Sequence, residues 1–194
     1  MNQKQINRII KLLRNKGVSF DKGLSNEEIL RVENKFKIQF PPDLKLFLQT
    51  QLPTSKSFVH WRYGINSEKG KNEIENRFNW PVRGILFDIK NNSFWLEQWG
   101  LKPKSSIEQI EIATNELLKK PKLIPIYSHR YIPSSPYEIG NPVFSVYQKD
   151  IIYYGNDLAS YFANEFRFDL PESFGKIAKP KRINFWSDMI ELNS

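Results

Sequence analysis

The chain has 194 residues, of which 40% are hydrophobic and 14% aromatic. This composition excludes global disorder, because disordered chains lack the apolar groups that offset the entropy lost on ordering, and the length suits one domain with extensions. The absence of cysteine excludes disulfides, thiol nucleophiles and thiolate metal sites. The formal net charge of +8 favours acidic or anionic partners.

Residues 1–23 are predicted to form a basic amphipathic helical arm. In QKQINRIIKLLRNKG the apolar residues recur at helical spacing, and cations occupy the opposite face. The segment lacks the apolar centre of a signal peptide and the length of a membrane span, so we expect a cytoplasmic protein. The helix could pack on the domain or contact nucleic acid, a membrane surface or an acidic protein. Its candidate residues for an anionic partner are Lys4, Arg8, Lys11 and Arg14.

A helical hairpin is predicted next. Ser25 and Glu28 have the spacing of a capping box, in which the serine oxygen accepts a backbone N–H and the glutamate returns to the cap. The helix that follows should end at IQFPP, because proline lacks an N–H and restricts the residue before it. Pro41 or Pro42 can then open a second helix at its first turn.

From residue 58 onward, strand-like segments dominate. They are predicted at 58–63, 83–89, 93–100 and 122–128, and as a tight hairpin over 142–148 and 150–155. Two helices, over 105–120 and 156–166, interrupt them. Residues 169–194 should form a C-terminal extension with a short helix, packed on the domain through Phe185 and Trp186. The order of these elements predicts an α+β fold with a largely antiparallel sheet packed with helices.

No pattern of reactive residues stands out. The two histidines, His60 and His129, lack nucleophile-elbow and metal-ligand spacing, and a metal site would need them to converge with Asp88 or Glu97. The glycines form no phosphate-binding loop. We therefore predict no catalytic residue, metal or cofactor and no enzymatic activity. A hydrolase that uses His129 is a further alternative.

Aromatic residues and arginines gather in a way that is typical of binding surfaces. The segment HRYIPSSPYEIGNP is interpreted as a proline-stiffened loop that presents the side chains of His129, Arg130 and Tyr131. The alternative is that at least two of the tryptophans fill the core. The candidate partner-binding residues are Trp61, Arg62, Trp95, Trp99, His129, Arg130, Tyr131 and Tyr137.

The segment LSNEEILRVENKFKIQFPPDLKLFLQ resembles the start of SUKH superfamily domains, the group with the Smi/Knr-type cell-wall regulators and many bacterial immunity proteins. Later segments, among them WPVRGILFDIKNNSFWLEQWG and GNPVFSVYQKDIIYYGNDLASYFANEF, are similar to a bacterial branch of that family. The resemblance covers residues 24–168. The chain differs from the family at QTQLPTS, after the second predicted helix, where family members often have Asn-Gly or Gly-Gly.

The resemblance implies a SUKH-like α+β fold and a non-enzymatic immunity protein, or antitoxin, of a polymorphic toxin system. Such a protein binds and neutralises a cognate toxin domain. Immunity proteins against nucleases are commonly acidic, whereas this chain is basic. Either a nuclease partner is bound through some other surface, or the toxin is of another kind. The alternative function is binding of nucleic acid or an anionic surface through the basic N-terminal arm.

Overall fold

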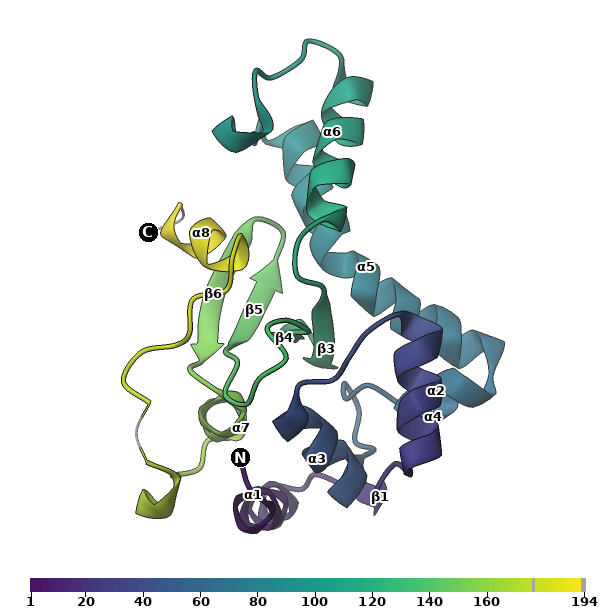
Figure 1. Ribbon diagram of the computed structural model, residues 1–194, viewed down its shortest axis with the longest axis vertical. Coiled ribbons are helices and arrows are strands. Elements are labelled where there is room, and N and C mark those ends of the chain that lie inside the picture. Colours follow the sequence, from purple (N-terminus) through teal and green to yellow (C-terminus); the bar gives the residue numbers. More distant parts are fainter. Residues whose placement is uncertain (176, 193–194) are drawn as a thin grey trace.

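The computed structural model describes residues 1–175 and 177–192 and has an α+β architecture (Figure 1). One antiparallel sheet has the strand order β3-β4-β5-β6, and β1 pairs with β2 in a separate antiparallel ladder. The strands are β1 (Phe20–Lys22), β2 (Gln51–Pro53), β3 (Leu123–Tyr127), β4 (Arg130–Pro133), β5 (Val143–Tyr147) and β6 (Asp150–Gly155). The α-helices are α1 (Gln3–Asn15), α2 (Asn26–Phe36), α3 (Pro42–Thr50), α4 (Trp61–Asn66), α5 (Glu68–Asn91), α6 (Ser106–Leu118), α7 (Leu158–Phe166) and α8 (Trp186–Glu191), and the short 3-10 helices are η1 (Glu97–Trp99) and η2 (Glu172–Phe174).

The four-stranded sheet has apolar packing on both faces. Successive strand side chains point to opposite faces, and neighbours such as Ile124 and Leu123 accordingly enter different apolar clusters. The first cluster includes residues of α1, α3 and α7, and the second includes residues of α5, α6 and α8. The sheet is therefore enclosed between two groups of helices, which explains why β3 and β4 are almost entirely buried.

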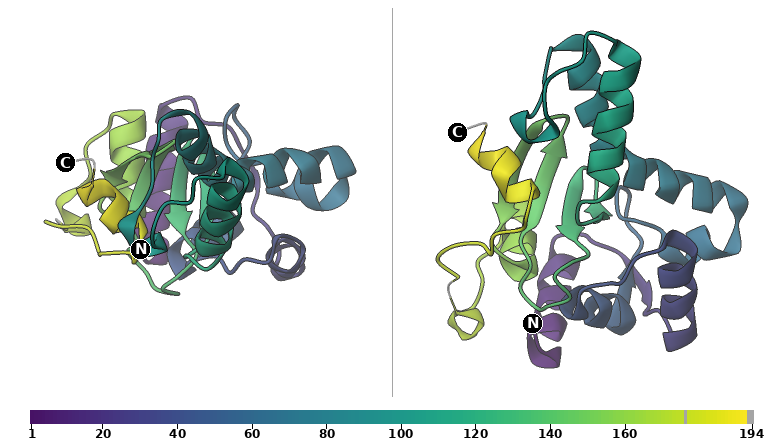
Figure 2. Two further views of the ribbon diagram at one scale, coloured as in Figure 1. Left: turned by 90° about the horizontal axis from the view of Figure 1, so that it is seen from above. Right: turned by 45° about the horizontal axis from the view of Figure 1, so that its top comes forward.

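Helix α5 is the longest element and contacts α4, α6, β3 and β5. It crosses the molecule diagonally, with α2 and α4 near one end and α6 alongside the other (Figures 1 and 2). Because α5 reaches from one helical group to the other, it positions segments that are far apart in the sequence.

Several predicted elements are confirmed. Ser25 and Glu28 form the capping box of α2, with Ser25 N to Glu28 Oε2 at 2.9 Å and Glu28 N to Ser25 Oγ at 3.1 Å. Pro42 opens α3, β5 and β6 form the predicted hairpin, and α8 is docked by buried Phe185 and Trp186. The helices predicted within 1–23 and over 105–120 and 156–166 are also present.

The strands predicted at 58–63, 83–89 and 93–100 are wrong. The first segment enters α4, the second lies inside α5, and the third contains η1. Proline at position 81 suggests a chain break, yet Ile74, Pro81 and Ile85 are buried at helical spacing on one face of α5. Burial of this face against the sheet overrides the local cost of proline within a helix.

A distant tyrosine compensates for Pro81. Because Pro81 has no N–H, the carbonyl of Arg77 loses its helical donor. The Tyr131 hydroxyl donates to that carbonyl at 2.9 Å, and Tyr131 itself is only 1% exposed. The loop predicted to present Arg130 and Tyr131 is therefore wrong: these residues belong to strand β4.

Replacing Tyr131 with phenylalanine is expected to lower the free energy of unfolding by about 1–3 kcal/mol, because it leaves the Arg77 carbonyl without a donor. Urea unfolding measures the change. An exposed ring, Tyr137→Phe, is the matched control and should leave stability unchanged. Equal stability of Tyr131→Phe and the original chain would contradict the compensating role.

Helix α1 is part of the core. Its apolar residues Ile6, Ile9, Ile10 and Leu13 belong to the same cluster as α3 and α7 residues. Residues 1–23 therefore pack into the domain rather than project from it. Within residues 1–175 and 177–192, no helix combines the length and apolar character needed to cross a bilayer.

Candidate functional site

The eight predicted partner-binding residues do not form one surface. Trp61 is 2% exposed and packs against the rings of Phe36 and Phe40, with centroids 5.9 and 5.1 Å apart. Trp99 is also buried, beside the half-buried Trp95, whose indole N–H donates to the Gly100 carbonyl. A surface role for Trp61 and Trp99 is wrong, because their rings fill the core as in the alternative interpretation.

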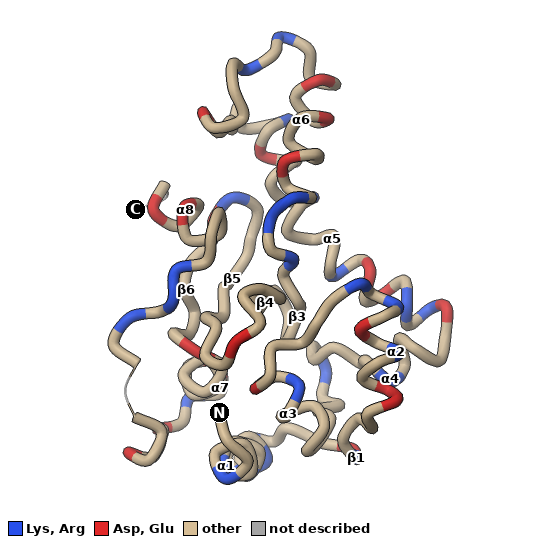
Figure 3. Tube along the Cα trace, viewed as in Figure 1, with Lys and Arg blue, Asp and Glu red and all other residues tan. Residues whose placement is uncertain are grey.

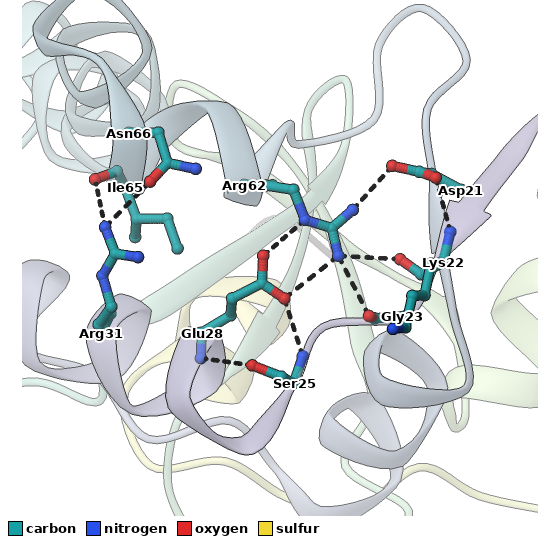
Figure 4. A network of polar contacts seen from close by, with 9 residues as sticks. All are labelled: Asp21, Lys22, Gly23, Ser25, Glu28, Arg31, Arg62, Ile65 and Asn66. Atoms are coloured by element: carbon teal, nitrogen blue, oxygen red, sulfur yellow. Dashed lines mark hydrogen bonds and ion pairs between the residues drawn. The ribbon is translucent and has the colours of Figure 1, made fainter.

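Arg62 joins three segments of the fold (Figure 4). Its guanidinium donates to Glu28 at 2.6 Å and to Asp21 at 2.8 Å. It also donates to the carbonyls of Lys22 and Gly23, at 3.0 and 3.1 Å. Arg62 therefore connects α4 to β1 and to the start of α2, and its donors are directed inward to structural partners.

This network makes stability depend on pH. The hydrogen bond from Arg62 holds the pKa of Glu28 below its ordinary value of 4.5. A lowered folded-state pKa contributes stability above the unfolded pKa, and that stability is lost as pH falls through the folded pKa.

Replacing Glu28 with glutamine should remove this pH dependence and keep the cap, because glutamine also completes a capping box. The original chain is expected to lose more unfolding free energy than Glu28→Gln when the pH falls from neutral to about 3. Chemical unfolding at both pH values measures this difference. Equal losses in the two proteins would contradict the assigned role of Glu28.

Arg130 and Tyr137 do not share a surface. Arg130 is buried, donates to Glu165 and Ser145 at 2.8 and 2.7 Å, and lies 3.7 Å from the centroid of the Tyr154 ring. Its predicted surface role is wrong because these groups enclose its charge. Tyr137 is 47% exposed, but it follows the end of β4 opposite His129.

His129 instead lines a groove of about 520 Å³ beside α5. One wall comes from α5, and the other comes from the β3–β4 turn, from β4 and from the end of β5. The lining residues are Ser57, Asn76, Arg77, Trp80, Arg83, Ser128, His129, Tyr131 and Tyr147. None of them is acidic.

Helical spacing and sheet register together build this groove. Arg77, Trp80 and Arg83 lie on neighbouring turns of α5 and share one face. The β3–β4 turn and the last residues of β5 meet at one end of the sheet, because Arg130 pairs with Ser145 and Val146 N donates to the His129 carbonyl at 3.0 Å.

The β5–β6 turn approaches α5 closely at Gly84. A Cβ there would lie 2.8 Å from the Cα of Gln148, so glycine permits this contact. Asp88 further fixes the turn by accepting the Lys149 N–H at 2.8 Å. Asp88 is buried and accepts a second bond from Asn92, so its carboxylate supports the groove wall.

The groove carries positive charge beside exposed rings. Trp80 is 45% and Tyr147 57% exposed. Arg77 donates to the Ser57 carbonyl at 3.0 Å, and burial lowers its pKa. Arg83 donates to the Asn76 carbonyl at 2.8 Å. This arrangement can bind an anionic group at the guanidiniums and a flat apolar group against the rings.

His129 contributes as a largely neutral side chain at pH 7. Burial and then the Arg130 charge lower its pKa below the ordinary value of 6.5, whereas Glu165 acts in the opposite direction. Its Nδ1 lies 3.1 Å from Ser128 Oγ. Among residues 1–175 and 177–192 no group of three or more histidine, aspartate or glutamate side chains is arranged to hold a metal ion.

The candidate residues chosen from the sequence include His129 and Tyr131 but leave out Arg77, Trp80, Arg83 and Tyr147, although Trp80 belongs to the clusters of aromatic residues and arginines seen in the sequence. The segment RFNWPVR contains the missing signal, because a helix through it places its two arginines and its tryptophan on one side. Comparison with family models, curated proteins and solved structures finds no match for this chain.

Proposed function

We propose that the chain is a non-enzymatic binding protein of the immunity type, which neutralises a toxin domain by covering part of it. The observation that supports this most is the groove beside α5, where exposed Trp80 and Tyr147 flank two arginines. Tryptophan, tyrosine and arginine dominate the binding energy of protein interfaces. The resemblance of residues 24–168 to SUKH immunity proteins favours the same function.

The groove is suited to binding because its walls are held in place before a partner arrives. Asp88 fixes the β5–β6 turn on α5, and the Tyr131 hydroxyl joins β4 to α5. A preorganised surface loses little conformational entropy on association. Binding at this groove would block the toxin sterically and would require no chemical step.

Co-purification from native cells tests the proposal. The tagged full chain is isolated with and without nuclease treatment, and its companions are identified by mass spectrometry. We expect a stoichiometric protein that survives nuclease treatment, inhibits growth when produced alone and is harmless when produced with this chain. Recovery of nucleic acid alone would refute the immunity function.

A second candidate function is anionic-surface binding through α1. Lys4, Arg8 and Lys11 lie on its exposed face, which carries cations and no acidic residue (Figure 3). Arg14 is less available, because it donates to Gln51 at 2.7 Å and lies over the Phe20 ring. Insertion of the apolar stripe into a membrane would compete with the core, because that stripe is buried.

Salt dependence distinguishes this second candidate. Affinity based on phosphate contacts falls steeply with ionic strength, and neutralising Lys4, Arg8 and Lys11 together should abolish it. The triple variant should fold normally because these three side chains are exposed. Unchanged nucleic-acid or vesicle binding by the triple variant would exclude α1 as the binding surface.

A further inference from the structure

We infer that the groove beside α5 binds a protein segment through a carboxylate side chain held between Arg77 and Arg83, with an adjacent apolar side chain against Trp80. The inference rests on the proposed function, in which this groove receives the partner. It adds the chemical class of the segment that enters.

The first support is the charge of Arg77. Burying a cation is costly unless an anion compensates it. Arg62 and Arg130, the other part-buried guanidiniums discussed above, each have a glutamate, at 2.6 and 2.8 Å. In the described part of the chain, Arg77 forms no ion pair: burial is the larger influence and lowers the pKa of Arg77, and Glu73, one turn earlier on α5, acts on it only at longer range. A carboxylate from a partner would supply the missing charge.

The second support is the number of donors that remain. A guanidinium has five N–H groups in a planar fork, which matches the two oxygens of a carboxylate. Arg77 donates to the Ser57 carbonyl, and Arg83 to the Asn76 carbonyl. Both bonds hold the arginine heads in place and leave further N–H groups for a ligand.

The third support is the position of Trp80 between the two arginines. Arg77 and Arg83 are six residues apart on α5, which spans about 9 Å along a helix. Arg83 reaches back to the Asn76 carbonyl, so its guanidinium lies near the turn that carries Arg77. The half-exposed Trp80, which lies between the two arginines in sequence, lines the same groove as Tyr147. An acidic residue beside an aromatic or aliphatic residue fits two guanidiniums with an exposed ring in the same groove.

The same features favour a protein segment over a nucleic-acid strand. A strand carries one negative charge per nucleotide and is usually bound along an extended basic track. The groove has two guanidiniums and three aromatic rings within about 520 Å³. Such a short site matches one carboxylate with an apolar neighbour.

Selection from a random dodecapeptide library tests the inference without a known toxin. The immobilised full chain should enrich peptides that carry aspartate or glutamate next to an apolar residue. An enriched peptide is then titrated against the original chain and Arg83→Gln, with binding followed by isothermal titration calorimetry. We expect affinity to fall at least about tenfold, as for loss of a charge-assisted pair. The matched control Arg8→Gln changes an exposed arginine of α1 and should bind like the original chain.

The failures of the two proposals are distinguishable. The carboxylate inference would be overturned by any of three results: no peptide is enriched, the enriched peptides lack acidic residues, or Arg83→Gln binds them with unchanged affinity. Arg77→Gln provides a second variant, and circular dichroism checks that both fold. Acidic peptides that bind at Arg83, in a protein that neutralises no toxin, would refute only the immunity function. A co-purified toxin that binds Arg83→Gln normally would refute only the carboxylate inference.

Discussion

Replacing Ile9 and Leu13 with alanine is expected to unfold much of the protein at room temperature. Both side chains are completely buried in the cluster that joins α1 to α3 and α7. Each truncation of a buried aliphatic side chain costs about 2–5 kcal/mol. The two together approach the total stability of a typical domain, about 5–15 kcal/mol. Circular dichroism and urea unfolding measure the loss.

The matched control changes the opposite face of the same helix. Lys4→Gln with Lys11→Gln alters exposed side chains and should change stability by less than about 0.5 kcal/mol. Near-native stability of the double alanine variant would contradict the packing of α1 into the domain. Deletion of residues 1–22 is therefore unsuitable for testing anion binding, because it would remove part of the core together with the charges.

Replacing Trp80 with alanine is expected to weaken binding of the proposed protein partner by about 2 kcal/mol or more, which is roughly a thirtyfold increase in Kd. The indole is 45% exposed at the groove and supplies a large rigid contact area there. Its exposure also means that the protein should fold without it. Titration calorimetry with the co-purified partner measures the affinity.

Tyr137→Ala provides the comparison for Trp80→Ala. Tyr137 is similarly exposed but lies beyond the opposite end of β4, outside the groove. We expect this variant to keep its affinity. If Tyr137→Ala loses binding and Trp80→Ala does not, the partner docks at the predicted loop over residues 129–142 and not at the groove beside α5.

Local sequence signals predicted the elements whose stabilising contacts are local. The capping box of Ser25 and Glu28, the proline at the start of α3 and the β5–β6 hairpin lie within a few residues of the positions they determine. Helix α5 was missed because the group that compensates for Pro81, the Tyr131 hydroxyl, is 54 residues from the carbonyl it serves. Hydropathy alone does not reveal that contact.

The candidate site was also only partly predictable, because contacts between distant parts of the sequence determine which of its side chains are accessible. His129 follows a predicted strand and is one of only two histidines in the sequence, so it was a candidate, and it does line the groove. Arg130 also looked available, but Glu165, 35 residues later, pairs with its charge. Arg77, Trp80 and Arg83 could be grouped only after residues 68–91 were recognised as one helix.

Site-specific photocrosslinking in native cells tests the central claim most directly, namely that a protein partner docks at the groove beside α5. A photoreactive amino acid is placed at Tyr147, which is 57% exposed in the groove, or at Tyr137 outside it. The account predicts a discrete protein adduct from position 147 that resists nuclease, and none from position 137. An adduct only from position 137, or a nucleic-acid adduct from position 147, would contradict it.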